Sequence, residues 1–187
     1  MNTLKKWGVV ATAAGLGAVG VAAFAAGASA DGGGGSQRPF TITERLSGFH
    51  ETPLALSTSG QGSIRLRVDP AAGTIAYTVR YANLEGTVTQ SHIHFGSRSQ
   101  SGGISVFLCS NLGNGPAGTP ACPTTNPGEV SGVLDSSDVI GPAAQGITAG
   151  QFSELLAAIR ADSTYVNVHS TLYPAGEVRN QLTPHHH

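Results

Sequence analysis

The chain has 187 residues, and only 11% of them are charged. Both lysines lie at the start, as Lys5 and Lys6, so residues 31–187 carry eight arginines against eleven acidic residues, a formal charge of −3. Because no basic run or patch is recognisable, the sequence excludes the electrostatic footprint of a nucleic-acid-binding protein, and no nucleic-acid partner is predicted.

Residues 1–30 have the layout of a secretory signal peptide. Lys5 and Lys6 precede an uncharged stretch rich in Ala, Gly and Val at 7–26, and Ala28-Ser29-Ala30 is a small-x-small cleavage signature. An uncleaved membrane anchor is the alternative, since the apolar stretch is long enough to span a bilayer. Cleavage predicts a secreted protein, periplasmic or extracellular, with no membrane attachment once the signal is removed.

Residues 31–39 are rich in glycine and predict a flexible linker, and one β domain follows over 40–184. In this domain apolar and polar residues alternate in short runs between turn residues, a pattern typical of strands with one buried face. Strands are predicted over 40–46, 63–69, 74–81, 87–95, 104–108, 129–134, 165–170 and 177–182. About seven or eight such strands favour an all-β fold, an antiparallel sandwich or barrel.

One short helix is predicted among the strands, over residues 148–162. Its apolar residues recur at i, i+3, i+4 and i+7, which places them on one buried stripe. They are Phe152, Leu155, Leu156 and Ile159. Thr148, with Gln151 three residues later, resembles a capping box and marks the predicted start of the helix.

The chain contains two cysteines, Cys109 and Cys122. In an exported protein they are most simply one disulfide. The segment between them, 110–121, is a loop by its glycine, asparagine and proline content, and a bridge would join its two ends. A redox-active or metal-binding pair is the alternative, but the wide spacing lacks the C-x-x-C pattern of such pairs.

The candidate site begins with two histidines on one predicted strand. His92 and His94 are two residues apart, so they point to the same side of the strand, while Ile93 and Phe95 point to the other. Two imidazoles side by side on a rigid backbone are either half of a metal site or a local polar cluster. The histidines at 185–187 end the chain as a truncated purification tag or a native tail, and they are left out of the fold prediction.

A series of motifs runs in order through the domain. They are Leu46-Ser47-Gly48 with Glu51 and Pro53, Gly62, Tyr77-Thr78-Val79, His92-Ile93-His94-Phe95-Gly96, Tyr165-Val166-Asn167-Val168-His169-Ser170 and Pro174-Ala175-Gly176-Glu177-Val178-Arg179-Asn180-Gln181-Leu182. In this order they resemble the CHRD domain, the module named after chordin and found in many secreted bacterial proteins, over about residues 40–182. The late motif with Asn167, His169, Gly176, Glu177 and Arg179 is the most specific part.

The resemblance implies an immunoglobulin-like β-barrel or sandwich, and it supports the fold more strongly than the function. In chordin such domains accompany growth-factor binding, so an extracellular protein partner is one expectation. No residue of this sequence indicates that the partner is a growth factor. Two features depart from the family pattern. His50 stands in the first motif where a histidine is not typical, and the loop between Cys109 and Cys122 looks like a local elaboration.

His169 extends the candidate site to a third imidazole. If its strand lies beside that of His92 and His94, the apolar residues of both strands point into the core and the three imidazoles converge on one external patch. The arrangement is similar to the copper site of copper/zinc superoxide dismutase, and imidazole suits copper and zinc. A surface metal site, most suited to copper, is therefore predicted, with His50 as a candidate fourth ligand. The residues predicted to support the ligands are Asn167, Glu177 and Arg179.

Three interpretations of the histidines stay open. The first is a non-enzymatic binding protein that holds a metal ion. The second is a structural or protein-interaction module, in which hydrogen bonds from the histidines to Asn167, Glu177 or backbone stabilise the sheet. The third is a copper-dependent redox enzyme. Because the zinc histidines and supporting aspartate of a dismutase are not recognisable, no catalytic residue is predicted and enzyme activity is the less favoured interpretation.

Overall fold

The computed structural model describes residues 37–184. The predicted signal peptide at 1–30, most of the predicted linker at 31–39 and the histidine tail at 185–187 lie outside the described residues. Within 37–184, none of the helices has the length and apolar character needed to cross a membrane.

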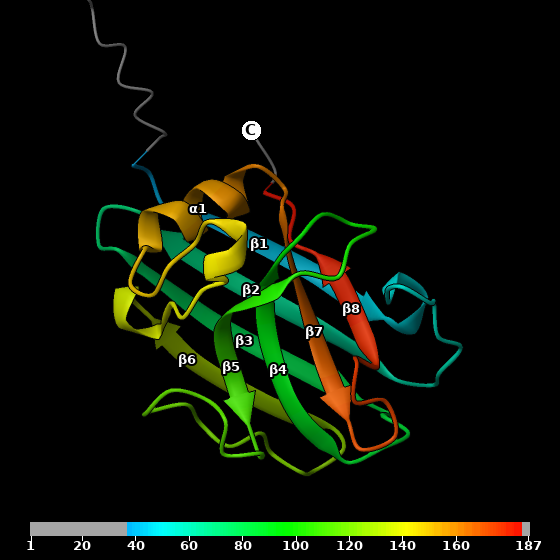
Figure 1. The fold of residues 1–187 in the computed structure, drawn as a ribbon. Helices are drawn as coiled ribbons and strands as arrows, with labels where there is room; N and C mark the ends of the chain where they lie inside the picture. The colour runs from blue at the N-terminus through cyan, green and yellow to red at the C-terminus, as the bar shows by residue number, and fades with distance from the viewer. Residues whose placement is uncertain (1–36, 185–187) are drawn as a thin grey trace, which may run out of the picture. The chain divides into compact units, whose positions relative to one another are not determined.

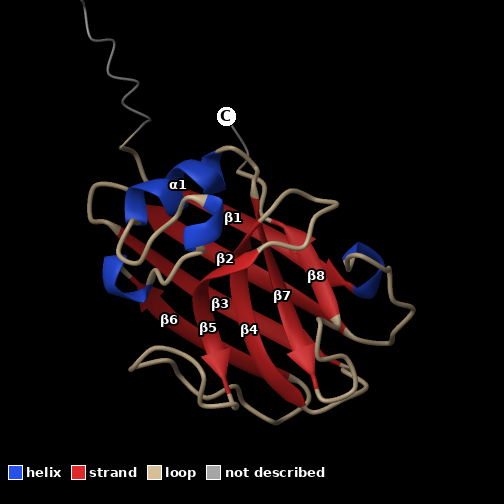
Figure 2. Cartoon of the chain, viewed as in Figure 1, coloured by secondary structure: helices blue, strands red, loops and turns tan. Residues whose placement is uncertain are grey.

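Strands make up most of the secondary structure in the described residues (Figure 2). They are β1 (Phe40–Ser47), β2 (Gln61–Asp69), β3 (Thr74–Ala82), β4 (Val88–Phe95), β5 (Gly103–Ser110), β6 (Gly128–Leu134), β7 (Thr164–Ser170) and β8 (Val178–Gln181). Between them lie the α-helix α1 (Phe152–Arg160) and the short 3-10 helices η1 (Gly48–His50), η2 (Ser136–Asp138) and η3 (Ala143–Gln145).

All eight strands form one antiparallel sheet with the order β5-β4-β7-β8-β1-β2-β3-β6. The sheet folds over on itself so that its end strands β5 and β6 come into contact, which nearly closes a barrel (Figure 1). The joint is narrow between β1 and β8, whose register has the single pair Ser47↔Arg179. The predicted all-β antiparallel fold with one short helix is confirmed.

This joint divides the sheet into two halves. We call β5, β4, β7 and β8 the covered half, because the side chains on its outer face are largely buried beneath loops. We call β1, β2, β3 and β6 the open half, because most outward side chains there are exposed or partly exposed. The two halves face each other across the hydrophobic core (Figure 1).

The core is built from the inward residues of both halves. Fully buried members are Ile42, Leu66, Val79, Ile93, Val106, Val166 and Val168. The predicted inward direction of the apolar residues in β4 and β7 is therefore confirmed. The apolar stripe of α1 joins the core through Leu155 and Ile159, so the helix covers one end of the barrel (Figure 1). Burial of each such side chain stabilises the fold by about 1.5–3 kcal/mol.

The helix α1 is shorter than the sequence predicts. It begins at Phe152 rather than Thr148, because Gly150 has a φ of +83°, a left-handed conformation through which an α-helix does not continue. The predicted capping pair forms a turn before the helix instead. In this turn the side chain of Gln151 accepts a hydrogen bond from the backbone N–H of Thr148 at 2.7 Å.

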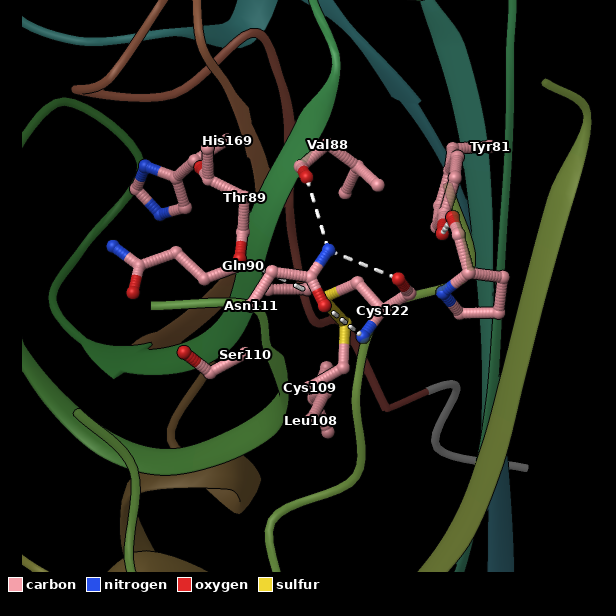
Figure 3. Close-up of a disulfide and its surroundings, with 12 residues drawn as sticks. Tyr81, Val88, Thr89, Gln90, Leu108, Cys109, Ser110, Asn111, Cys122 and His169 are labelled. Atoms are coloured by element: carbon pink, nitrogen blue, oxygen red, sulfur yellow. Dashed lines mark hydrogen bonds between the residues drawn. A yellow bond between two sulfur atoms is a disulfide. The ribbon is translucent and has the colours of Figure 1, made fainter. Parts of the chain in front are cut away.

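The predicted disulfide is confirmed, with Cys109 at the end of β5 bonded to Cys122 at an S–S distance of 2.04 Å (Figure 3). Asn111 fastens the enclosed loop. Its Nδ2 donates to the carbonyls of Val88 and Cys122, at 3.1 and 2.9 Å, and its Oδ1 accepts from the N–H of Cys122 at 2.9 Å. The bridge and Asn111 together tie the loop to the start of β4, which is a structural role.

Candidate metal centre

The candidate site lies on the outer face of the covered half, where β4 and β7 are hydrogen-bonded neighbours. The pairing sets His92 opposite Asn167 and His94 opposite Tyr165. His169 follows Asn167 by two residues and therefore lies on the same face of β7. The condition on which the three-histidine site depends, that the two histidine-bearing strands are neighbours, is therefore met.

The three imidazoles meet on this face. The ring centroid of His92 lies 5.3 Å from that of His94 and 5.0 Å from that of His169, and the last two are 6.2 Å apart. One ring nitrogen from each histidine lies within 4.8 Å of the other two. Two nitrogens bound to one ion at about 2.0–2.1 Å are roughly 3.3–4 Å apart, so small side-chain rotations bring all three into one coordination sphere.

The site is buried, whereas the sequence predicts an external patch. The relative exposures of His92, His94 and His169 are 0%, 7% and 5%. Neighbouring rings cover them. Phe107 of β5 packs edge-on against His92, with 4.4 Å between the ring centroids. Tyr165 stacks on His94, with 4.7 Å between the ring centroids and an angle of 2° between the ring planes. The prediction of a surface site is wrong because strand alternation specifies the side that a residue faces and not what covers that side.

Backbone carbonyls set the tautomers of two histidines. The Nδ1 of His94 lies 2.9 Å from the carbonyl oxygen of Gly102, and the Nδ1 of His169 lies 2.9 Å from that of Pro174. A carbonyl oxygen only accepts, so both Nδ1 atoms carry the hydrogen and donate it. Each ring therefore keeps its lone pair on Nε2, and a hydrogen bond of this kind is the usual support of a metal-binding histidine.

The inner nitrogens of the cluster are poorly supplied with hydrogen-bond partners. The Nε2 of His169 lies 3.1 Å from the Nδ1 of His92, which is a hydrogen bond between the two rings. The Nε2 atoms of His92 and His94 are buried and have no partner. Leaving a buried polar atom unpaired costs about 1–3 kcal/mol, and a bound cation offsets that cost.

Burial keeps the three imidazoles neutral at pH 7. Desolvation, together with smaller effects of the neighbouring His169 and His94, lowers the pKa of His92 to about 2. Desolvation also lowers the pKa of His94 to about 4, although the hydrogen bond to Gly102 acts in the opposite direction. The pKa of His169 is lowered for the same reason. Neutral imidazole is the form that binds metal ions.

Arg179 holds the loop that covers His94. The acceptors of its Nη2 are the carbonyl oxygens of Ser97 at 3.2 Å, Arg98 at 3.3 Å and Gln100 at 2.8 Å. Its Nη1 donates to the hydroxyl of Thr52. Its guanidinium carbon lies 3.4 Å from the ring centroid of Tyr165, which is stacked in turn on His94. Arg179 is thus a buried positioning residue, two layers away from the imidazole.

The other two predicted supporting residues lie in different surroundings. Asn167 is buried opposite β4, and its Oδ1 has no hydrogen-bond partner. The carboxylate of Glu177 accepts hydrogen bonds from the hydroxyl of Thr58 at 2.9 Å and from the N–H of Glu85 at 2.7 Å. Glu177 therefore fastens two turns, and within residues 37–184 it makes no ion pair with Arg179.

His50 lies outside the histidine cluster. It is exposed at the end of η1, and its Nδ1 lies 3.3 Å from the carbonyl oxygen of Arg179. Among the described residues, the group with metal-binding geometry consists of His92, His94 and His169.

Glu51 is a buried carboxyl group that the sequence analysis did not assign to the site. It is 7% exposed, and its Oε1 has no hydrogen-bond partner. The carboxylate fits because Gly176 has no side chain: a Cβ at that position would lie 2.6 Å from Oε1. Burial raises the pKa of Glu51 to about 7, and the positive charge of Arg179 opposes this rise. Glu51 therefore titrates near neutral pH.

Several contributors to the site are not among the predicted site residues. Tyr165 lies two residues before Asn167, so strand alternation already placed it on the histidine face. Phe107 reaches the cluster only because β5 pairs with β4. The carbonyls of Gly102 and Pro174 belong to loops without periodicity, and the sequence carries no signal for them.

Comparison with protein families gives one finding. The family model of the CHRD domain matches residues 42–182, which is most of the chain. No curated protein and no solved structure matches the sequence of this chain.

Proposed function

The chain belongs to the CHRD domain family, and we propose that it is an exported binding protein that holds one copper ion between His92, His94 and His169. Membership of the family supports a binding or interaction module. Export rests on the signal-like sequence of residues 1–30, and the disulfide is compatible with an oxidising compartment.

The observation that carries the metal proposal is the anchoring of two imidazoles by backbone carbonyls. His94 and His169 each donate from Nδ1, at 2.9 Å, to a fixed acceptor. Both rings are therefore held with Nε2 free of hydrogen, before any ion arrives. A ligand set that is oriented in advance loses little entropy on binding, which favours affinity.

Copper is the metal that this donor set suits best. Imidazole binds copper, zinc, iron and nickel, and among the divalent ions the affinity is highest for copper. The group contains three neutral imidazoles and no carboxylate among the described residues. Burying a charged ion without an anionic ligand is costly, and the cost rises with its charge, so the monovalent Cu(I) state is favoured over Cu(II).

The surroundings favour holding the ion over turning over a substrate on it. Phe107 and Tyr165 cover the cluster from two sides, and the three histidines are at most 7% exposed. A redox enzyme resembling superoxide dismutase requires an open coordination position that a substrate reaches. We therefore favour a metal-binding function over a catalytic one. The likeness to the dismutase copper site is limited to the position of three histidines on two strands.

A structural or protein-interaction module without metal is the second candidate. The hydrogen bond between His92 and His169 favours it, because it gives the Nδ1 of His92 and the Nε2 of His169 a partner within the protein. In this alternative the histidines only stabilise the contact between β4 and β7. An extracellular protein partner is then expected on another surface of the domain.

The deciding experiment is a copper titration of the protein ending at Pro184, which removes the three terminal histidines. Cu(I) is titrated against a competing chelator, and Cu(II) is followed by electron paramagnetic resonance. One ion per chain is expected, with tighter binding of Cu(I). His92→Ala and His169→Ala are each expected to weaken binding at least about a hundredfold, since they remove one of three ligands.

His50→Ala is the matched control, because His50 is exposed and lies outside the cluster. Thermal unfolding of each variant checks that the domain is still folded. Unchanged copper affinity in folded His92→Ala and His169→Ala variants would exclude the metal site and leave the structural module. An assay of superoxide turnover by the copper-loaded protein tests the enzyme alternative, and rates no higher than those of free copper would dismiss it.

A further inference from the structure

The outer face of the open half carries four exposed arginines on three adjacent strands. They are Arg45 on β1, Arg65 and Arg67 on β2, and Arg80 on β3. In the folded protein they form a basic patch, which the sequence alone does not predict. The arginines are too far apart along the chain to form a run, and only the pairing of β1, β2 and β3 brings them together.

The strand register makes Arg65 the centre of this arginine face. Arg45 and Arg80 both pair with Ser63, two residues before Arg65 on β2, so each lies diagonally across from it at about 7–8 Å. Arg67 follows on the same side of β2 at about 6.6 Å. The four guanidinium groups therefore project from one small area of the sheet.

Acidic groups neutralise little of this charge. Glu129 of β6 pairs with Arg80 at 2.5 Å. Asp69 lies on the same face at the end of β2, where its carboxylate accepts a hydrogen bond from the N–H of Ala72 in the turn. Within residues 37–184, the guanidinium groups of Arg45, Arg65 and Arg67 have neither an ion pair nor a hydrogen bond to the protein.

Hydroxyl groups lie between the arginines. Arg65 is flanked by Thr43 on β1 and by Thr78 on β3, and the next residue in that row is Ser131 on β6. The hydroxyls of Thr78 and Ser131 lie 3.0 Å apart and bond to each other. The face therefore alternates cationic groups with neutral hydroxyls that donate and accept hydrogen bonds.

A hollow of about 490 Å³ opens beside the arginine face. Its lining combines polar residues of the same face, Ser63, Arg80 and Glu129, with the less polar Tyr81 and Pro127. Its volume lies within the range of small-molecule sites, which gives room for one residue of a polymer that lies across the strands.

We propose that the arginine face binds an anionic polysaccharide, with carboxylate or sulfate groups on the guanidinium groups and one sugar unit in the hollow. Arginine pairs with such planar or multi-oxygen anions through two parallel hydrogen bonds. The threonine and serine hydroxyls match the hydroxyls of the sugar. The negative formal charge of residues 31–187 does not oppose this, because charges beyond about 10 Å are screened at 0.1 M salt.

Two other polymers fit this face less well. Single-stranded nucleic acid is held by aromatic side chains on which bases stack, and the outward residues of β1, β2, β3 and β6 include no aromatic one. Protein partners usually bury an apolar centre, whereas the large exposed apolar residue here is Val133 at the margin of the face. A polymer that carries anionic groups and hydroxyls can form hydrogen bonds with both the guanidinium groups and the hydroxyls of the face.

The test measures binding of the full chain to immobilised polygalacturonate and to dextran sulfate, with uncharged dextran and duplex DNA as comparison polymers. Binding to at least one of the two anionic polysaccharides is expected at 50 mM salt, together with loss at high salt. The double variant Arg65→Gln/Arg67→Gln is expected to weaken it about tenfold or more, since two charge-assisted contacts are removed. The two polysaccharides distinguish carboxylate from sulfate recognition.

Arg98→Gln is the matched control for the single variant Arg65→Gln, because each removes one positive charge from an exposed side chain and the two lie on different halves of the molecule. Wild-type affinity in this variant supports a local site. An equal loss in Arg98→Gln and in Arg65→Gln would overturn the proposal, since net charge alone would then explain the binding. Failure to bind either anionic polysaccharide, or tighter binding to DNA, would overturn it as well. Copper affinity is independent of these outcomes.

Discussion

The two halves of the sheet are built from the same alternating pattern, yet their outer faces differ. The outward residues of the covered half, among them His92 and His94, are buried, whereas those of the open half include exposed arginines. The difference lies in the connections. The loop after β4 and the segment before β8 fold back onto the histidines, while β2 and β3 are joined by a tight turn and leave their outer face free.

This contrast shows two environments in which the outward side chains of a strand lie. On the covered half the protein supplies its own partners, because carbonyls, aromatic rings and Arg179 surround the imidazoles. This network is only partly satisfied, because the Nε2 atoms of His92 and His94 have no hydrogen-bond partner, and unpaired polar atoms in a low dielectric are costly. On the open half water solvates the guanidinium groups, so the protein neither gains nor loses much stability from them.

Removal of Arg179 tests the covered half most severely. Arg179→Ala is expected to lower the free energy of unfolding by about 4 kcal/mol, because it removes the hydrogen bonds of a buried guanidinium group to three loop carbonyls and its stacking on Tyr165. Urea unfolding measures the loss. The matched change Arg67→Ala on the open half is expected to stay within about 0.5 kcal/mol, and similar losses in both variants would contradict the contrast.

Glu51 makes the stability of the covered half depend on pH. Because burial raises its pKa to about 7 from an ordinary 4.5, the folded protein keeps a proton that the unfolded chain releases between about pH 4.5 and 7. Stability contributed by the neutral form is therefore complete below pH 4.5 and is lost as the pH rises through 7.

Glu51→Gln is expected to remove the loss of folding stability that accompanies the rise in pH through 7. The variant should be more stable than the wild type by up to about 3 kcal/mol at pH 8, and by little at pH 4.5. Unfolding by urea at both pH values measures the difference. A gain of the same size at both would show that ionisation of Glu51 is not its cause.

Copper is expected to stabilise the covered half by mass action. At a free Cu(I) concentration one hundred times the Kd, the free energy of unfolding should rise by about 2.7 kcal/mol. Thermal unfolding with and without the ion measures the shift. His94→Ala should abolish it while His50→Ala retains it, and a shift that survives in His94→Ala would place the ion elsewhere.

The smallest effect is expected on the open half. Arg65→Gln should change the free energy of unfolding by less than about 0.5 kcal/mol, because its guanidinium group is exposed and makes no contact with another charge among the described residues. Chemical unfolding at low salt is the sensitive measurement. A destabilisation above about 1 kcal/mol would reveal a structural role for the arginine face.

Much of the fold was predictable because its signals are local. Alternation in the runs around Leu66 and Val79 identifies β2 and β3. The presence of two cysteines in a chain with a predicted export signal indicates a disulfide, which is confirmed. The start of α1 was misplaced because the conformation of Gly150 depends on a turn that no periodicity records. The match of the CHRD family over residues 42–182 also rests on the order of local motifs.

By itself the sequence determined that His92 and His94 share a face with each other, and that Asn167 shares one with His169, because side chains alternate with period two. Only the tertiary structure decided that the two faces lie on the same side of the sheet and that loops bury them. Strand order, loop paths and cross-strand register depend on contacts between residues distant in the chain, which no local pattern encodes. The same contacts turned scattered arginines into one cationic face.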